Sequence, residues 1–305
     1  MGYVQTDSNA IVVVDLFYFF IKNKIIIKMS YLNEFFANIF VISLFDKIQR
    51  WKKMRTQFES RNIKINRLIA TDGRCKDQRP DGCIAKINTF SIIFNKNLNY
   101  VLKPKSKLPE RTAAISLTLT TMQILKNAIE NKNKFTLICE DDIELPRKFS
   151  EKFKNIIEQL KKSKKMNWDT LYLGVGGYGG NNDMSLVETK KTPYLSDIAK
   201  HTGDVFYVKN KNDLRSYCYD KNNCTYVTEN VVRSYLPGGC WCYAISLKGA
   251  KKIISLFNKQ NPIHIDQFYM DNVQEKNIIA YACNPPIVMH EAGFARPDSD
   301  IPWSW

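Results

Sequence analysis

The stretch Lys134-Phe-Thr-Leu-Ile-Cys-Glu-Asp-Asp-Ile-Glu144 joins a short apolar run directly to a cluster of acids. The apolar run, residues 134–139, has the length and composition of a buried strand. Glu140, Asp141 and Asp142 then follow at its carboxyl end. Ligands of open α/β sheets bind beyond the carboxyl ends of the strands. The stretch therefore predicts a sheet protein whose site begins at these acids.

Neighbouring carboxylates repel one another, so their concentration at a strand end favours a compensating cation. Mg²⁺ and Mn²⁺ bind one or two protein carboxylates together with substrate phosphates. We therefore expect Asp141 and Asp142 to be metal ligands, with Mn²⁺ or Mg²⁺ as the ion. The alternative is an exposed acidic turn that interacts with the positive end of the next helix.

Strand and helix patterns alternate on both sides of this stretch. Apolar runs predict strands at 39–44, 67–70, 168–173, 226–235 and 240–246, with strand and loop at 278–289, and helical spacing predicts helices at 46–61, 112–131, 147–162 and 248–258. Thr112 is a candidate cap for the second of these helices, and the polar segment 74–109 is expected to be a variable excursion. The alternation predicts an α/β fold with a mainly parallel sheet flanked by helices.

The chain has 305 residues, 44% of them hydrophobic, and a formal net charge of +15. This length fits one large α/β domain. The charge is carried by lysines spread along the chain, which reflects either codon usage or attraction to an anionic partner. A basic nucleic-acid-binding protein is an alternative, but no recognised nucleic-acid motif is visible, so we expect no specific nucleic-acid partner. No phosphate-binding glycine motif follows the first strand, which argues against P-loop enzymes and NAD dehydrogenases.

The eight cysteines show no C-x-x-C spacing, which argues against a structural zinc site. Cys139 lies in an apolar run and is expected in the core. Cys75 with Cys83, and Cys218 with Cys224, can each close a short loop in an oxidising compartment.

The N-terminal stretch 10–27 is apolar and aromatic but is interrupted by Asp15, Lys22 and Lys24. It is shorter than a clean membrane span, so residues 1–38 are expected to be an extension or a weak signal anchor through which the protein associates with a membrane. The alternative is a native start at Met29. Both a cytoplasmic and an endomembrane-associated protein fit this pattern.

Several segments in order resemble glycosyltransferase family 25, the family of bacterial lipooligosaccharide galactosyltransferases and procollagen galactosyltransferases. The matching segments are Val41-Ile-Ser-Leu44 with Arg50, Ile69-Ala-Thr-Asp-Gly73, Leu137–Leu145, Trp168-Asp-Thr-Leu-Tyr-Leu-Gly174, Gly239-Cys-Trp-Cys-Tyr-Ala-Ile-Ser246 with Lys248-Gly-Ala-Lys-Lys252, Ile265-Asp-Gln-Phe268 and Asp298-Ser-Asp-Ile301. Each match is weak alone, but their order makes the joint signal specific.

The resemblance implies a GT-A fold over residues 39–305, with a nucleotide-binding half at about 39–145 and an acceptor half at about 146–305. It further implies metal-dependent transfer of a hexose, galactose or glucose, from a UDP-sugar to a hydroxyl of a glycan or hydroxylated protein, with inversion. This is the chemistry of glycan and lipopolysaccharide biosynthesis.

The resemblance also assigns site residues, and the sequence adds others. Val41, Ser43 and Arg50 match the nucleotide-binding segment, and Asp72 with Gly73 is either a nucleoside contact or an ordinary turn. His290, after a late strand, is a candidate third metal ligand or diphosphate contact.

The attacking acceptor hydroxyl needs a general base, for which Asp266 is the first choice. The alternative role of Asp266 is that of a helix N-cap. Asp271 and Glu291 are next in line as the base.

One position departs from the family pattern. The family has G-x-A-L-S-H in the helix before the acidic motif, whereas this chain has Thr112-Ala-Ala-Ile-Ser-Leu117. Leu117 cannot donate a hydrogen bond. A catalytically inactive glycan-binding relative is therefore a further alternative.

Overall fold

The structure is a computed structural model that describes residues 30–75, 80–94, 108–176, 226–234, 237–260, 264–284 and 286–290. The predicted N-terminal anchor, the Cys218–Cys224 pairing and the Asp298-Ser-Asp-Ile301 segment lie outside these ranges. Among the described helices, none is both long and apolar enough to span a bilayer.

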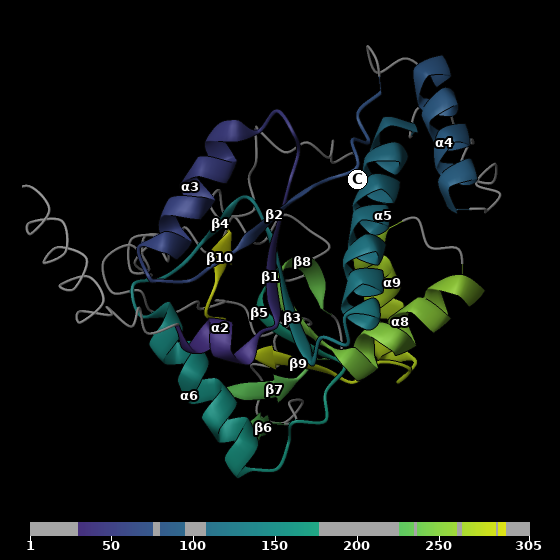
Figure 1. Cartoon of the computed structure of the whole chain (residues 1–305). Helices are drawn as coiled ribbons and strands as arrows, with labels where there is room; N and C mark the ends of the chain where they lie inside the picture. The colour runs from purple at the N-terminus through teal and green to yellow at the C-terminus, as the bar shows by residue number, and fades with distance from the viewer. Residues whose placement is uncertain are drawn as a thin grey trace, which may run out of the picture.

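An eight-stranded sheet forms the centre of the molecule, in the order β2-β1-β3-β8-β5-β9-β7-β6 (Figure 1). The strands are β1 (Asn38–Ser43), β2 (Asn66–Ile69), β3 (Phe135–Glu140), β5 (Thr170–Gly176), β6 (Tyr226–Thr228), β7 (Val231–Arg233), β8 (Gly238–Ser246) and β9 (Ala280–Cys283). Only β7 and β8 run against the direction of the other six strands. The expected α/β fold with a mainly parallel sheet is confirmed.

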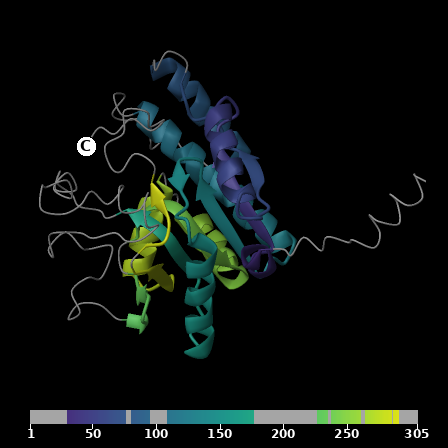
Figure 2. The same cartoon turned by 90° about the vertical axis from the view of Figure 1, so that its left-hand side faces the viewer.

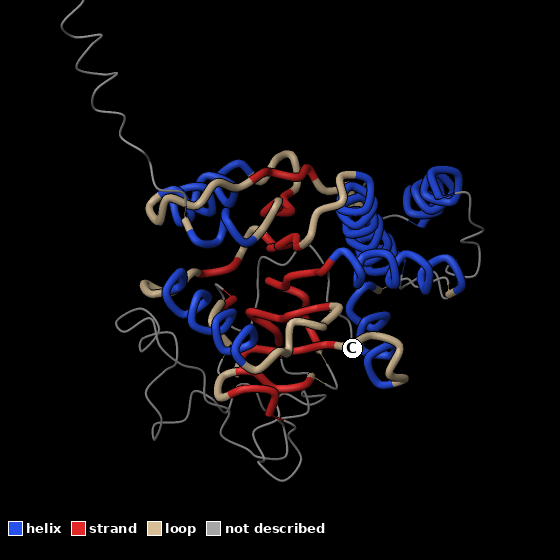
Figure 3. The backbone as a smooth tube through the Cα atoms, turned by 60° about the horizontal axis from the view of Figure 1, so that its bottom comes forward, coloured by secondary structure: helices blue, strands red, loops and turns tan. Residues whose placement is uncertain are grey.

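Helices cover both faces of this sheet, as Figure 3 shows. The side chains of β1 alternate accordingly: Ile39 and Val41 face one core cluster, and Phe40 and Ile42 face the other. The first cluster is closed by α2 (Tyr31–Phe35), α3 (Ile48–Glu59) and α6 (Phe149–Lys162). The second is closed by α5 (Leu108–Glu130), α8 (Leu247–Lys259) and α9 (Ile265–Gln274).

The predicted halves of the chain occupy different ends of one continuous sheet. Residues 39–145 supply β2, β1 and β3, and residues 146–305 supply the remaining five strands. A separate ribbon of two short strands pairs β4 (Ile143–Glu144) with β10 (Met289–His290). The domain bounds themselves stay a prediction.

Local details differ from the expectations at four places. The segment predicted as a polar excursion contains α4 (Pro80–Phe94), which packs on α5 through a small core cluster including Ile87 and Leu119. The helix α5 begins at Leu108, four residues before Thr112, so Thr112 is not its cap. The predicted strand 226–235 is a tight hairpin of β6 and β7. The short α2 was not predicted.

Because most strands are parallel, their carboxyl ends meet along one side of the sheet and their amino ends along the opposite side. We call these sides the carboxyl edge and the amino edge. At the carboxyl edge the chain leaves β1, β2, β3 and β5. At the amino edge it enters these strands from helices on either face. Figure 2 shows that α4 and α6 project from opposite ends of the body. The candidate site lies at the carboxyl edge, as expected for this class of sheet.

Candidate active site

The acidic motif meets an arginine that lies 91 residues earlier in the chain. Asp141 and Asp142 occupy the turn between β3 and β4, and both residues are less than 9% exposed. Arg50 Nη1, from the first turn of α3, lies 3.4 Å from Asp141 Oδ1 and 3.6 Å from Asp142 Oδ2. One nitrogen thus contacts both carboxylates, so the structure brings together the predicted nucleotide-binding arginine and the predicted metal ligands.

Burial raises the pKa of Asp141 above its ordinary value. A hydrogen bond from Ser43, at the end of β1, opposes this rise, the negative charge of Asp142 adds to it, and Arg50 opposes it. Burial and carboxylate repulsion outweigh the two favourable partners. The pair therefore sits where an additional positive charge is favoured.

Two carboxylates fit a Mn²⁺ or Mg²⁺ ion that is shared with a substrate diphosphate. Among the described side chains there is no group of three or more His, Cys, Asp or Glu residues arranged to hold a metal. Such ions commonly use only one or two protein carboxylates and fill their remaining positions with water and phosphate oxygens. The two carboxylates of Asp141 and Asp142 suit an ion that is also bound by water and phosphate oxygens. They do not suit a site in which the protein supplies every ligand.

The C-terminal strand β10 brings His290 to the acidic motif. His290 pairs with Ile143, the residue after Asp142, in the antiparallel β4–β10 ribbon. This register places its backbone beside the turn, although the side chain of His290 is not among those described. The predicted proximity to the acids therefore holds for the main chain, and the role of the imidazole stays a prediction.

Gly174, on β5, allows the segment that leads to β10 to cross over β5. The backbone N–H groups of Ile287 and Val288 both donate to the carbonyl of Leu173, at 2.8 and 3.1 Å. A Cβ on the neighbouring Gly174 would lie 2.6 Å from the carbonyl oxygen of Val288. Only glycine allows the segment 286–290 to pass so closely over β5 and reach β4.

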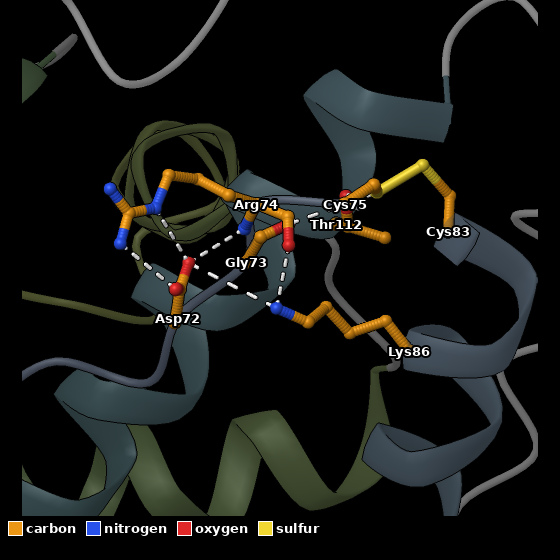
Figure 4. The surroundings of a disulfide bond; sticks show 7 residues. All are labelled: Asp72, Gly73, Arg74, Cys75, Cys83, Lys86 and Thr112. Atoms are coloured by element: carbon orange, nitrogen blue, oxygen red, sulfur yellow. Dashed lines mark hydrogen bonds and ion pairs between the residues drawn. A yellow bond between two sulfur atoms is a disulfide. The ribbon is translucent and has the colours of Figure 1, made fainter. Parts of the chain in front are cut away.

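The loop after β2 forms a second part of the carboxyl edge (Figure 4). The guanidinium of Arg74 contacts Asp72 at 2.9 Å and Asp46, just after β1, at 2.8 Å. Hydrogen bonds from Arg74 are the largest influence on the pKa of both carboxyls, and they lower it. Asp72 is thus ionised and exposed, and it can accept hydrogen bonds. Arg74 links its loop to Asp46, just after β1.

Helices α4 and α5 both contact the loop after β2. The disulfide between Cys75 and Cys83 ties it to α4, and Lys86 Nζ donates to the carbonyl of Arg74 at 2.6 Å (Figure 4). The Cys75–Cys83 pairing predicted from the sequence is therefore present. Cys75 Sγ also lies 3.0 Å from Thr112 Oγ1 of α5.

Gly73 is buried against α5. A Cβ at this position would lie 2.5 Å from the carbonyl oxygen of Thr112, so close loop-to-helix packing explains the glycine without any ligand. Whether Gly73 also contacts a nucleotide stays a prediction.

Other predicted residues lie farther from this arrangement. Val41 is fully buried inside β1, so its side chain belongs to the core and does not reach the edge. Asp266 lies in the first turn of α9, on the face covered by α5 and α8, whereas Arg50 lies on the face covered by α2 and α6.

The N-cap of α9 is His264, so the interpretation of Asp266 as a cap is wrong. Leu117, at the position of the family histidine, is half-buried and packs against the second core cluster.

Arg74, Asp46 and Arg67 were missed from the sequence. Arg67 Nη2 donates to the carbonyl of Leu44 at 2.7 Å, and its guanidinium lies 5.6 Å from the ring centre of Trp51. These residues connect the ends of β1 and β2. Their only sequence signal is a charged residue within five positions of a strand end.

Comparison with known proteins identifies the family. The model of glycosyltransferase family 25, described as LPS biosynthesis protein, matches residues 36–269, and the chain belongs to this family. The chain is 22% identical over 267 residues to procollagen galactosyltransferase 2 of Mus musculus, a match that covers 83% of this chain and 35% of that protein. The chain thus spans about a third of the length of this relative. Family membership supports glycosyl transfer as the activity and a nucleotide sugar as the donor.

Proposed function

We propose that this glycosyltransferase moves a hexose, galactose or glucose, from a UDP-sugar to a hydroxyl of a glycan or protein acceptor. The observation that carries the proposal is the meeting of Arg50 with Asp141 and Asp142 at the carboxyl edge of the sheet. The name of the mouse relative, a procollagen galactosyltransferase, favours galactose and a hydroxylated protein among the candidates.

The nucleotide would lie along the ends of β1 and β2. The carboxylate of Asp72 is 46% exposed and can accept hydrogen bonds from a ribose hydroxyl or a base N–H. Ser43 ends β1, which lies between β2 and β3 in the sheet, and Arg50 contacts the acidic pair. A donor bound in this direction would place its diphosphate near Asp141 and Asp142.

Asp141 and Asp142 would hold a Mn²⁺ or Mg²⁺ ion together with the diphosphate. When bound, such an ion neutralises charge on the departing nucleotide. Arg50 supplies a positive charge at the same place, and His290 is the proposed third ligand or diphosphate contact.

Asp266 is the proposed general base. An acceptor hydroxyl must lose its proton as it attacks the anomeric carbon, and with inversion the base lies on the side opposite the leaving group. Asp266 lies in the first turn of α9, on the other face of the sheet from Arg50. The family-like segment Ile265-Asp-Gln-Phe268, which contains it, supports the proposal.

A catalytically inactive glycan-binding relative is the second candidate. It is favoured by Leu117, an apolar side chain that packs into the core where the family has a histidine. This protein would bind a nucleotide sugar or a glycan without turnover.

A screen of UDP-, GDP- and CMP-sugars separates these candidates. Thermal shift reports binding, because a ligand at a hundred times its Kd stabilises the folded state by about 2.7 kcal/mol. Release of the nucleotide with and without acceptor then reports turnover. We expect a UDP-hexose to stabilise the protein and to be consumed. Stabilisation without turnover supports the inactive relative, and the absence of any nucleotide-sugar effect contradicts the proposed transfer.

A further inference from the structure

Exposed lysines gather at the amino edge of the sheet, opposite the candidate active site. They lie in the last turn of α6 and on the connections that lead from helices into strands, and we call this set the basic edge. Its members are Lys64, Lys132, Lys134, Lys161, Lys162, Lys164, Lys165 and Lys276.

The strand directions place these lysines on one side of the molecule. Lys64 precedes β2, Lys132 and Lys134 precede β3, and Lys276 precedes β9, all of which run in parallel. The densest part is Lys161-Lys-Ser-Lys-Lys165, where α6 ends and the chain turns toward β5. Residues scattered over more than 200 positions of sequence thus share one edge.

Helix ends explain part of this charge. The helices α3, α5, α6 and α9 end at this edge, and Lys132, Lys164 and Lys276 adopt the left-handed conformation just after three of them, with φ of 52°, 55° and 61°. Each helix terminus carries roughly half a negative charge, so four termini offset about two lysines.

Carboxylates do not neutralise the remaining lysines. The exposed acids in the last turns of the same helices and on these connections are Glu34, Glu59, Glu130 and Glu275, half as many as the eight lysines. Within the part of the chain that the structure describes, Lys162, Lys164 and Lys165 form no ion pair, unlike Lys154 with Glu158 on the outer face of α6. The basic edge therefore carries more positive charge than the helix termini and the nearby carboxylates offset.

The chain reaches its first described helix at this same edge. Lys161 Nζ donates to the hydroxyl of Tyr31 at 3.3 Å, and Asn33 Nδ2 donates to the carbonyl of Lys64 at 2.8 Å. The short helix α2 is thus held between two connections of the basic edge. The sequence that precedes it, residues 10–27, is apolar and aromatic.

We propose that the basic edge binds the surface of an anionic lipid bilayer. Lysines near an anionic membrane and an adjacent apolar segment are two signals that add in membrane binding. The adjoining apolar stretch favours a bilayer over a nucleic acid, which would match the charge alone. Since the two edges lie at opposite ends of the same strands, this orientation leaves the carboxyl edge facing away from the lipid and open to donor and acceptor.

Co-sedimentation of the full chain with vesicles tests this inference independently of any sugar transfer. The vesicles are phosphatidylcholine alone or phosphatidylcholine with phosphatidylserine, each at low and at high salt. The test variant combines Lys162→Gln, Lys164→Gln and Lys165→Gln, whose side chains are exposed. The matched control combines Lys52→Gln, Lys148→Gln and Lys259→Gln, which removes the same charge from exposed positions elsewhere.

We expect salt-sensitive binding to the anionic vesicles that the test variant weakens by roughly a hundredfold, about fivefold per lysine, and the control far less. Replacing the same three lysines with arginine keeps the charge and should retain binding, which excludes misfolding as the cause. Equal binding of the test variant and the wild type overturns the proposal. Equal binding to neutral and anionic vesicles also overturns it, as does charge-dependent binding to duplex DNA but not to vesicles.

Discussion

Arg50 Nη1 lies 3.4 Å from Asp141 Oδ1, which connects the first turn of α3 to the end of β3. This contact compensates the charge of Asp141 only in part, because burial still raises the pKa of this carboxyl. The raised pKa means that the folded protein binds the proton more tightly than the unfolded chain does. In the metal-free protein the ionised Asp141 therefore costs stability.

The first prediction concerns stability against pH in the presence of a chelator. As pH rises from the ordinary carboxyl value of 3.8 through the raised pKa, the contribution of Asp141 to stability should fall and then level off. Asp141→Asn lacks this titration and should melt at a higher temperature than the wild type at pH 7. Thermal melts of both proteins across this range measure the difference. A lower melting temperature of the variant at pH 7 would show that the ion pair outweighs the cost of burial.

The second prediction concerns the divalent ion. Donor turnover should be lost in chelator and restored by added Mn²⁺, because the charge of the leaving diphosphate must be neutralised. The measurement is the rate of UDP release with chelator, with Mn²⁺ and with Mg²⁺. Full activity in chelator would mean that Arg50 alone supplies the counter-charge, and the metal proposal would fail.

The third prediction concerns the general base. Asp266→Asn should lower kcat on the order of a hundredfold while the affinity for the UDP-sugar is retained. Because His264 is the N-cap, the structural cost should include the helix-dipole contribution, about 0.3–1 kcal/mol, and no cap loss.

Glu275→Gln is the matched control for this prediction. It removes one carboxylate charge from an exposed position at the end of α9, where Glu275 accepts a hydrogen bond from Asn277 Nδ2 at 2.9 Å. An unchanged kcat for Asp266→Asn would move the role to another carboxylate, with Glu291 and Asp271 as the next choices. A changed donor affinity would place Asp266 in the sugar site instead.

The fourth prediction concerns the disulfide that holds the loop of Asp72. Reduction of Cys75–Cys83 removes a link across 8 positions of sequence, worth about 2–3 kcal/mol in the chain-entropy estimate. If Asp72 binds the nucleoside, the KM for the donor should rise roughly threefold to tenfold, or about 0.7–1.4 kcal/mol, with kcat nearly unchanged. The double variant Cys75→Ser, Cys83→Ser should show the raised KM and no further response to reductant. An identical KM before and after reduction would remove this loop from the donor site.

Much of the fold could be predicted because its signals are local. The apolar run before Glu140, the amphipathic pattern around Met54 and Phe58, and the helix after Ser246 each match an observed element. The helix α4 was missed because its segment follows polar turn residues and its packing partners are on α5. The hairpin of β6 and β7 was predicted as one strand because only two turn residues, Glu229 and Asn230, separate its two short strands.

The site was predictable only where a strand end carries charge. Asp141, Asp142 and Arg50 were named from the sequence, and the structure brings them together. The bridge of Arg74 to Asp46 and the β4–β10 ribbon depend on contacts between distant segments, which composition and spacing do not reveal. The close approach of Val288 to Gly174 likewise joins two distant segments.

The fifth prediction tests the acidic centre directly, by comparing Asp142→Asn with the wild type in a transfer assay that contains Mn²⁺ and a UDP-hexose. Asp142 is buried beside Arg50, and asparagine keeps its shape while removing the charge. We expect the variant to keep the wild-type fold by circular dichroism and to lose transfer. Normal turnover by Asp142→Asn in this buffer would contradict the assignment of the catalytic centre to the end of β3.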